Sequence, residues 1–551
     1  MNLPIKSLLG VWFMALIASG CMDLDVDNPN EPATDDVLDT SSDIESFGGD
    51  QYLQWWNGTQ KSYPGYTMSV MGQELTSSWG NFGKFDLGRQ PREAFVNTQD
   101  YDYNPLVESP WSNLYATVSN SIDVIRAIRY DDDFELETPG AEERLEAFVT
   151  FTKGLAYGSL ANQFDRAMLV DADSELQDED GIAVNFPPPD EPNYKEVLDF
   201  ALEKLSDAQQ MIDDNPEMLD IPDSWMLGGP DLTPAEFSQL INSYKTRFVL
   251  MNARTPDERD NLDVTQDRDV DWNDIINWVE NGYRDDLIMQ ADGSLRWGHH
   301  TNLINDPIWF RVNYELIGRK DESGEFQNWL DTDIHDRSAI TLDTPDERID
   351  GEVGYIANAG APFHDPARGT YFLSNYQFVR NFASYADGNV GPMPHMYSTE
   401  MDMYLAEALL RTDGDTDEVA ALINQTREDV AGLDPVSGDD SYEELFNAMR
   451  YEFELETMGS YGGMAYYHKR GWGHLEGRDY GGLPEGTPLH FPIPALEIEG
   501  ILEMEPYTFG GQGDDEWGAG SQSINGQFSS DQFERIRRAM QAAEVKEPEL
   551  K

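Results

Sequence analysis

Apolar and polar residues alternate with a helical period between Ser398 and Gly432. The first half of this stretch places apolar side chains at positions i, i+3, i+4, i+7 and i+8, which form one face of a helix: Met401, Tyr404, Leu405, Ala408 and Leu409. Thr399, followed three residues later by Asp402, predicts a capping box at the start of this helix. Gly414 is expected to end the helix.

The second half of the stretch predicts another helix, which begins at Thr416. Its apolar face consists of Val419, Leu422, Ile423 and Val430. Gly432 suits the left-handed conformation that ends many helices. From Thr399 to Gly432 is 34 residues, the length of one tetratricopeptide-type helix pair. Such a pair cannot bury its apolar face alone, so we expect similar pairs to stack against it.

Helical periodicity also dominates the N-terminal half of the chain. The segment from Thr233 begins with Thr-Pro-Ala-Glu, which indicates a cap with proline in the first turn. Near the C-terminus, Ser441 and Glu444 predict a capping box for a helix that extends to Leu455. The other segments with this pattern cover residues 41–60, 111–128, 142–162, 194–212 and 271–282. The pattern predicts a mainly α fold.

The helical period is lost in the middle of the chain. Residues 293–382 are rich in glycine, asparagine, proline and aromatic residues. We interpret a region of about 291–397 as a variable, loop-rich insertion between helical pairs at about 41–290 and 398–456. Large loops on a rigid scaffold often carry the binding function. Residues 63–91 also predict irregular loop with exposed rings, and residues 529–545 predict an extra helix in a C-terminal extension of about 511–551.

The charge of the chain excludes one class of partner. The 551 residues contain 104 acidic and 37 basic side chains, for a net charge of -67. Nucleic-acid binding requires a basic footprint, so we do not expect it here. The acidic composition favours a solvated surface suited to a saline environment, where salt screens repulsion between like charges. The alternative interpretation is attraction of cationic ligands.

The N-terminus has the pattern of a bacterial lipoprotein leader. Lys6 precedes the apolar run 8–17, which is long enough for a signal-peptide core and too short to span a bilayer. Small residues then lead to Cys21, the single cysteine of the chain. This arrangement resembles a lipobox, although Leu16 lies two positions earlier than the usual leucine. It implies a signal peptide over residues 1–20, acylation of Cys21 and a tether over residues 21–40. The alternative is an ordinary secreted protein with a chance cysteine.

Candidate ligand-binding residues are aromatic. Sugars present flat faces of C–H bonds on which indole and phenol rings stack, while amides, carboxylates and guanidinium groups bind the hydroxyls. Indole rings with polar neighbours in loop-like segments are therefore predicted to contact a ligand: Trp79 with Asn81, and Trp297, Trp309 and Trp329. For any one of these rings, packing in the core is the competing interpretation. Trp111, Trp272 and Trp278 lie on helix faces and are assigned to packing.

Motifs for catalysis and for metal binding are missing from the sequence. The eight histidines form no His-Glu-x-x-His pattern, and there is no GxSxG, P-loop or dinucleotide fingerprint. Two carboxylates could still form a hydrolase pair, but spacing alone cannot identify them among 104 acids. No cofactor is predicted. A structural calcium ion held by loop acids stays open, although no EF-hand spacing supports it.

An ordered series of C-terminal motifs resembles the SusD/RagB family of surface lipoproteins. It begins with Ala406-Glu407-Ala408-Leu409 and Ile423-Asn424-x-x-Arg427 in the helix pair. The acidic helix at Ser441–Leu455 and Phe491-Pro492-Ile493-Pro494-x-x-Glu497-Ile498 follow in the family's order. The chain departs from the family after Gly459, where a longer segment, 460–473, replaces the usual basic stretch. This departure puts the family's local salt bridges in doubt.

The resemblance implies a single SusD-like domain over residues 41–551 and a function in nutrient uptake. Family members carry tetratricopeptide-like pairs, cover a TonB-dependent transporter of the SusC type, and capture oligosaccharides or, in some cases, peptides without cleaving them. We therefore expect a protein anchored to the outer membrane through Cys21 and exposed at the cell surface, with a SusC-like partner and an oligosaccharide ligand. A peptide ligand, a lipid-anchored glycoside hydrolase and a pure scaffold are the alternatives.

Overall fold

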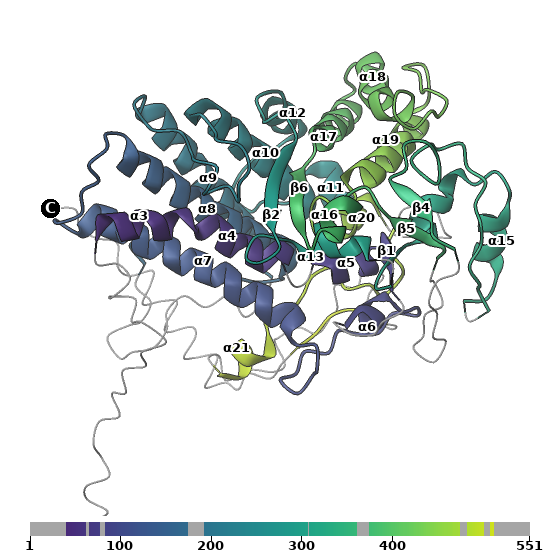
Figure 1. Cartoon of the computed structure of the whole chain (residues 1–551), viewed down its shortest axis with the longest axis horizontal. Coiled ribbons are helices and arrows are strands. Elements are labelled where there is room, and N and C mark those ends of the chain that lie inside the picture. Colours follow the sequence, from purple (N-terminus) through teal and green to yellow (C-terminus); the bar gives the residue numbers. More distant parts are fainter. Residues whose placement is uncertain are drawn as a thin grey trace, which may run out of the picture.

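The computed structural model describes residues 40–61, 65–77, 83–174, 192–306, 308–334, 336–360, 374–473, 482–500 and 507–511. Most of these residues are helical, as the periodicity predicted (Figure 1). The predicted tether, Cys21 and the helix expected at 529–545 lie outside these ranges. In the described part of the chain, no helix is both long enough and apolar enough to cross a membrane.

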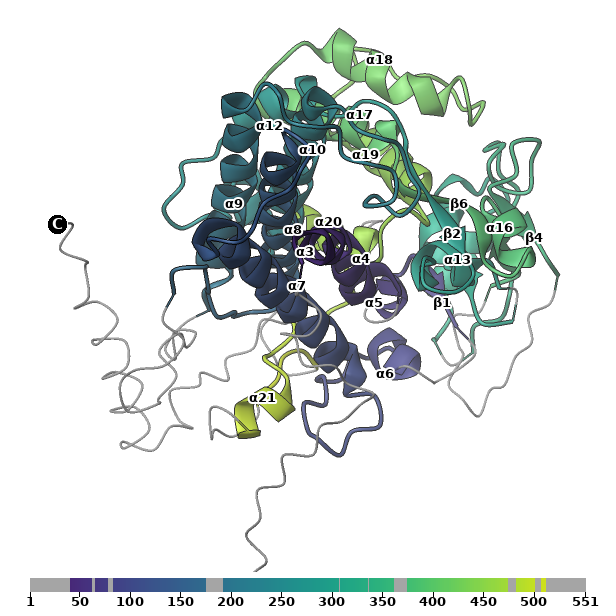
Figure 2. The same ribbon diagram turned by 60° about the vertical axis from the view of Figure 1, so that its left-hand side comes forward.

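Long helices stack side by side to form the larger part of the molecule (Figures 1 and 2). Each helix in the series packs against the next one, and α19 also packs against α17. The series consists of α7 (Pro105–Tyr130), α8 (Ala141–Gln163), α9 (Tyr194–Asp214), α10 (Pro234–Asn252), α12 (Trp272–Glu280), α17 (Ser398–Arg411), α18 (Thr416–Arg427) and α19 (Tyr442–Thr457). Helix α8 is buried on nearly every side, because α7, α9 and α10 surround it.

Shorter helices occupy the inner side of this stack. Helix α20 (Met464–Trp472) is buried along its whole length and contacts α10, α19 and two short helices, α5 (Gly65–Met71) and α11 (Pro256–Asn261). It lies within the arc of long helices in Figure 2. The segment that departs from the family pattern therefore forms a central helix. The remaining helices of the two ends of the chain are α3 (Ser41–Gly49), α4 (Gln51–Trp56), α6 (Lys84–Gly88) and α21 (Ala495–Gly500).

The predicted helix ends are confirmed in most cases. Capping boxes occur at Thr233 and at Ser441, and Gly432 adopts a φ of 67°. The capping box expected at Thr399 and Asp402 is wrong. The N-cap of α17 is Tyr397, two residues before the predicted one, and it makes no side-chain cap. Asp402 forms an ion pair with Arg284 instead.

The insertion contains short elements rather than continuous loop. Three antiparallel pairs of strands form there and at its borders: β1 (Leu75–Thr76) with β3 (Arg311–Val312), β2 (Leu287–Asp292) with β6 (Val390–Met396), and β4 (Ile356–Asn358) with β5 (Tyr376–Phe378). Short helices lie between them, namely α13 (His299–Asn302), α14 (Tyr314–Ile317), α15 (Glu325–Asp331) and α16 (Phe382–Ala386). A second hydrophobic cluster holds this region together and includes Tyr451 and Leu455 of α19 and Met458 directly after it.

Two expectations about exposed rings are wrong. Residues 65–71 form α5, which is buried throughout, and Tyr66 is only 1% exposed. Trp329 lies in α15 and is 3% exposed. Its ring packs against Tyr314 and Phe326 at centroid distances of 5.3 and 6.1 Å, and the Arg337 guanidinium lies 4.1 Å from its centroid. In both cases a short amphipathic segment buries its ring in the second cluster.

Buried ion pairs connect elements that are far apart in the sequence. Glu400 of α17 accepts two hydrogen bonds from Arg247 of α10, at 2.6 and 2.7 Å. Two turns further along α17, Glu407 binds Arg259 of α11 in the same bidentate way, at 2.6 and 2.9 Å. All four side chains are fully buried. These pairs are the strong, charge-assisted class of hydrogen bond.

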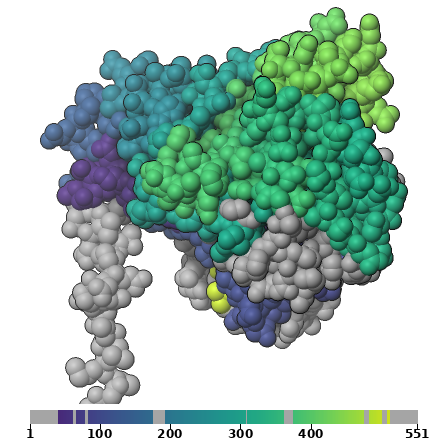
Figure 3. Space-filling model, turned by 45° about the vertical axis from the view of Figure 1, so that its right-hand side comes forward, coloured from purple at the N-terminus to yellow at the C-terminus, as the bar shows by residue number. Residues whose placement is uncertain are grey.

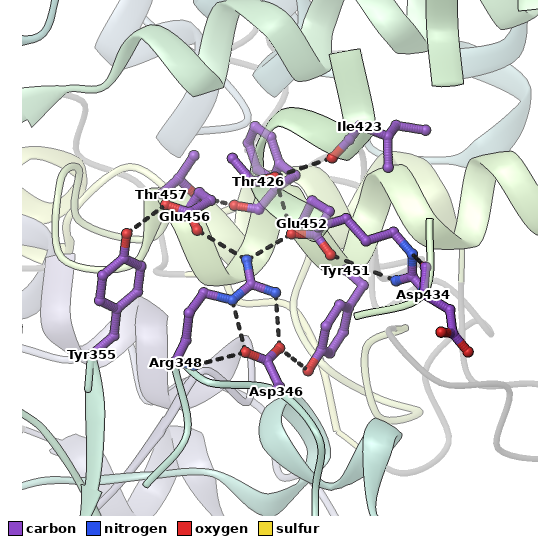
Figure 4. Close-up of polar contacts among 12 residues, drawn as sticks. Asp346, Arg348, Tyr355, Ile423, Thr426, Asp434, Tyr451, Glu452, Glu456 and Thr457 are labelled. Carbon is purple, nitrogen blue, oxygen red and sulfur yellow. Dashed lines mark hydrogen bonds and ion pairs between the residues drawn. The ribbon is translucent and has the colours of Figure 1, made fainter. Parts of the chain in front are cut away.

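The acidic helix α19 has a similar role between the insertion and α20. Glu452 and Glu456 bind Arg348 at 2.6 and 2.9 Å, and Asp346 completes the cluster (Figure 4). Glu454 points the other way, to Arg319 at 2.8 and 2.9 Å and to Lys469 of α20 at 3.0 Å. Local salt bridges therefore exist here despite the altered segment 460–473. Burial alone would raise the pKa of Glu454, but the two cations outweigh burial and lower it to about 2.

The pair between α10 and α17 gives a stability prediction. Glu400→Gln leaves the Arg247 charge buried without its carboxylate, so we expect the free energy of unfolding to fall by about 3–5 kcal/mol. The matched control is Glu146→Gln, which removes a half-exposed pair with Arg129 and should cost less than about 1 kcal/mol. Urea titration followed by circular dichroism measures both. The double variant Arg247→Met, Glu400→Leu should recover most of the loss; an equal loss there would rule out the unpaired charge as the cause.

Acid should weaken the contact of α19 with α20 in a defined range of pH. Because the folded-state pKa of Glu454 is depressed from 4.5 to about 2, its contribution is complete above about 4.5 and is lost as the pH falls toward 2. We expect the stability difference between the protein and Glu454→Gln to shrink over this interval by an amount on the order of a few kcal/mol. Taking the difference cancels the effect of protonating the many surface acids. Urea titrations from pH 7 to pH 2.5 that give parallel curves would contradict this assignment.

Candidate functional site

Two of the predicted tryptophans lie at the ends of a row of aromatic rings at the border of the insertion. The row runs from Trp297 through His299 and Tyr66 to Phe310, and Trp309 lies beside Phe310 with the Lys84 ammonium next to both rings; we call these five rings the ring row. Successive centroids from Trp297 to Phe310 are 4.7, 5.3 and 5.6 Å apart, with the rings edge to face. Tyr66 and Phe310 are 1% exposed, whereas Trp297, His299 and Trp309 are partly exposed. The interior of the row is thus fixed in the core, and both ends reach the surface.

Local hydrogen bonds hold Trp297 in place. Gly293 adopts a φ of 69° next to the end of β2, and the Asp292 carboxylate accepts hydrogen bonds from the backbone amides of Ser294 and Arg296, both at 2.8 Å. The Trp297 indole donates to the Ser294 carbonyl oxygen at 3.1 Å. The Trp297 carbonyl oxygen in turn accepts a hydrogen bond from the buried Trp56 indole at 3.2 Å. A tight turn therefore presents this ring from a rigid base.

Asp306 positions the other end of the row. Its carboxylate accepts hydrogen bonds from the backbone amides of Ile308 and Trp309, at 2.7 and 3.1 Å, and from the Tyr385 hydroxyl. Burial raises the pKa of Tyr385 to about 12, and the bond to Asp306 adds to the shift. The phenol is therefore a permanent donor at neutral pH. This contact joins α16 to the turn that carries Trp309.

Two cations lie behind the ring row. The Lys84 ammonium is 4.5 Å from the Phe310 centroid and 5.1 Å from that of Trp309. Burial lowers the pKa of Lys84 to about 7, and Asp306 opposes this shift only in part. Arg311 is 6% exposed, and its Nε and one terminal nitrogen have no hydrogen-bond partner among the described residues. A buried donor without a partner is costly, so these two nitrogens are candidate donors to an acceptor on a ligand.

Apolar side chains surround the partly exposed indoles. Leu295, Ile308, Phe382 and Val390 are 62%, 52%, 39% and 43% exposed. Val390 pairs with Asp292 across β2 and β6, next to the turn of Trp297, and the Phe382 ring lies 5.8 Å from that of Tyr385. In Figure 3 the green residues around α16 project from the surface beside the teal residues of the insertion. Flat rings, exposed apolar side chains and polar donors therefore gather on one face of the molecule.

The structure does not place the other three predicted site residues on this face. Trp79 and Asn81 lie outside the described residues. Trp329 is in the core, where neighbouring side chains cover its ring. Sequence reasoning missed Tyr66, Lys84, Arg311 and Tyr385, because their partners in the row are remote in the sequence. A single signal was available, the lysine within the aromatic segment 79–85.

Acidic side chains do not form a metal site in the described part of the chain. No group of three His, Cys, Asp or Glu side chains there is arranged to hold a metal ion. Burial raises the pKa of Glu74 to about 7, which is the kind of shift seen in a general acid. Glu74 is only 2% exposed, however, and the charged groups nearest to it are Lys469 and Glu454. It belongs to the ion-pair interior around α20 and does not face the ring row.

Comparison with known proteins places the fold. No protein-family model matches the chain, and no curated protein matches it by sequence. Solved structures do match it in fold. A SusD superfamily protein from Parabacteroides distasonis ATCC 8503 is 14% identical, with a TM-score of 0.54 over 84% of this chain and 97% of that one.

Two structures from Bacteroides thetaiotaomicron VPI-5482 give the same result. A SusD homolog is 13% identical, with a TM-score of 0.53 over 84% of this chain and 96% of that one. A SusD/RagB family protein is 13% identical, with a TM-score of 0.51 over 82% of this chain and 93% of that one. These matches extend over nearly the whole of each neighbour. The chain therefore has the SusD fold that its C-terminal motifs predicted.

Proposed function

We propose that this protein is a cell-surface binding protein that captures oligosaccharides and passes them to a SusC-like TonB-dependent transporter. The observation that carries the proposal is the ring row, with two partly exposed indoles fixed on a rigid base. The SusD fold and the lipobox-like sequence at Cys21 support it. The function requires binding and release of the ligand without making or breaking a covalent bond. Ligand affinity therefore depends on the rigid positioning of the rings.

The geometry suits a sugar ligand in three ways. Trp297 and Trp309 offer flat apolar surfaces for the C–H faces of pyranose rings. Asp306, Tyr385 and Arg311 offer acceptors and donors for hydroxyl groups. The Trp297 indole is held by its hydrogen bond to Ser294, and Asp306 holds the backbone of Trp309, so little conformational entropy is lost when a ligand binds. A ligand that spans both indoles has to be an oligomer rather than a single sugar.

The first prediction concerns the two indoles. In calorimetric titrations against a panel of neutral oligosaccharides, we expect Trp297→Ala and Trp309→Ala each to weaken binding at least tenfold, which corresponds to about 1.4 kcal/mol. Trp278→Ala is the matched control, because that indole is also partly buried but lies on α12, outside the ring row. It should leave the affinity unchanged. Thermal unfolding of each variant separates loss of binding from loss of structure.

The same titrations decide between the ligand classes. Oligopeptides of mixed sequence belong in the panel because the exposed Leu295, Ile308, Phe382 and Val390 could also contact apolar peptide side chains. Binding of peptides in place of glycans, with the same dependence on Trp309, would identify a peptide-capturing protein. Release of new reducing ends from a bound oligosaccharide would identify a hydrolase. If Trp278→Ala alone weakened binding, the site would lie elsewhere.

The second prediction concerns the anchor. Cys21→Ala removes the thiol that acylation requires, so we expect the protein to move from the membrane fraction to the soluble fraction of the cell, and metabolic labelling with a fatty-acid analogue to be lost. Ser19→Ala is the control, because it keeps the cysteine and a small residue at the cleavage site. A Cys21→Ala protein that stays in the membrane fraction would contradict lipid anchoring without affecting the assignment of the ring row.

A further inference from the structure

A pocket with an excess of positive charge lies between α19 and the turn that follows α14. It has a volume of about 380 Å³ and shares no lining residue with the ring row. Three of its lining side chains are cations, Arg319, Lys320 and Arg450, and Glu443 is the single acid. In a chain with 104 acids and 37 bases, three cations around one small pocket depart from the general composition.

The three cations differ in how far they are neutralised. Arg319 is held by Glu454 through two hydrogen bonds of 2.8 and 2.9 Å, so its charge is compensated. The Lys320 ammonium forms no hydrogen bond or ion pair within the described ranges, and lies 5.4 Å from the centroid of the Tyr451 ring. The Arg450 guanidinium lies 5.8 Å from the Phe446 centroid and 5.4 Å from that of Trp472. The pocket therefore presents Lys320 as a cation without a carboxylate.

The inner wall of the pocket is rigid. The Tyr451 hydroxyl donates to Asp346 at 2.8 Å, and Asp346 belongs to the buried cluster around Arg348 (Figure 4). Burial lowers the pKa of Lys320, and Arg427 adds to the shift, whereas Glu452 and Asp346 oppose it. An anion that enters the pocket would remove part of the cost of this partly buried charge. Preorganised cations of this kind bind with little rearrangement.

An aromatic surface borders the cations. Phe446 lines the pocket, and its ring is stacked on that of Tyr442, with centroids 5.6 Å apart and planes 12° from parallel. Tyr442 is 50% exposed. A ring platform suits the face of a sugar, and adjacent ammonium and guanidinium groups suit an oxyanion attached to it. The exposed Asn447 adds an amide for a hydroxyl group.

We propose that this pocket binds the oxyanion of an acidic sugar residue, either a carboxylate or a sulfate ester, with Lys320 and Arg450 as the cationic donors. The sugar part of the proposal rests on the function proposed above; the oxyanion part does not. Net charge does not exclude such a ligand, because at physiological ionic strength charges beyond about 8 Å are largely screened. Groups that line the pocket then decide which ligand binds.

The test is a set of calorimetric titrations in 0.15 M NaCl with four probes: sodium sulfate, an oligogalacturonate, a sulfated chondroitin oligosaccharide and a neutral maltooligosaccharide. We expect the two acidic oligosaccharides to bind more tightly than inorganic sulfate. Lys320→Gln should weaken their binding at least tenfold, and Arg450→Gln should weaken it in the same direction. Lys195→Gln is the matched control, because Lys195 is also partly exposed but is paired with Asp263 at 2.9 Å. Its effect should be below twofold.

Each outcome decides one part of the proposal. If none of the anionic probes binds, or if Lys320→Gln binds them as the unchanged protein does, the proposal is overturned. If inorganic sulfate binds as tightly as the sulfated oligosaccharide, the site takes a free oxyanion and the sugar part is wrong. Trp297→Ala separates the two sites, since it should weaken neutral glycans and leave the sulfate titration unchanged. Circular dichroism of Lys320→Gln and Arg450→Gln confirms that both variants are folded.

Discussion

Buried pairs between guanidinium groups and carboxylates are the interaction on which the rest of this structure depends. Helix α17 contributes Glu400 and Glu407, seven residues apart and therefore on one face, and each binds an arginine that the chain reached about 150 residues earlier. A charge buried in this way is stable only in the correct pairing, because any other arrangement leaves it without a partner. The bidentate geometry therefore fixes how α17 sits against α10 and α11, which a hydrophobic contact of the same area would leave free to slide.

The ion pairs of α19 also fix the positions of the elements that carry the ring row. Glu452 and Glu456 lie one turn apart and hold Arg348 of the insertion, whereas Glu454 points away from them and binds Lys469 of α20. The same Lys469 ammonium donates to the carbonyl oxygen of Gly72 at 2.9 Å, directly after α5. Helix α5 carries Tyr66, the ring at the centre of the row. One acidic helix thus positions both the insertion that carries Trp309 and the helix on which the row is based.

The helices were predictable from the sequence, because the apolar period is a local property of the chain. The caps at Thr233 and Ser441 follow from four consecutive residues and were found. The capping box predicted at Thr399 does not form, for a physical reason. Ser398 already adopts helical geometry there, and Asp402, the residue expected to complete the box, pairs with Arg284. A tertiary contact with a residue more than one hundred positions away outweighed a local hydrogen bond.

The candidate site was only partly predictable for the same reason. Trp297 and Trp309 were identified from their polar neighbours, yet the same criterion selected Trp329, which a short helix turns into the core. Nothing in the composition around Trp329 tells which side of this seven-residue helix will be covered. Arg311 is a clearer case. Its significance comes from two buried nitrogens that have no hydrogen-bond partner among the described residues, and burial of a charged side chain has no signature in the hydrophobic pattern.

The distribution of the bases changes what the net charge of -67 says about ligands. Buried carboxylates form ion pairs with Arg247, Arg259 and Arg348. Backbone carbonyl oxygens in the interior accept hydrogen bonds from Arg254 and Arg470. These five cations are therefore not available at the surface to a ligand. The field of the net negative charge is screened within about 10 Å in 0.1 M salt. The sign of a preferred ligand is then set by the few cations that remain at the surface, and not by the total.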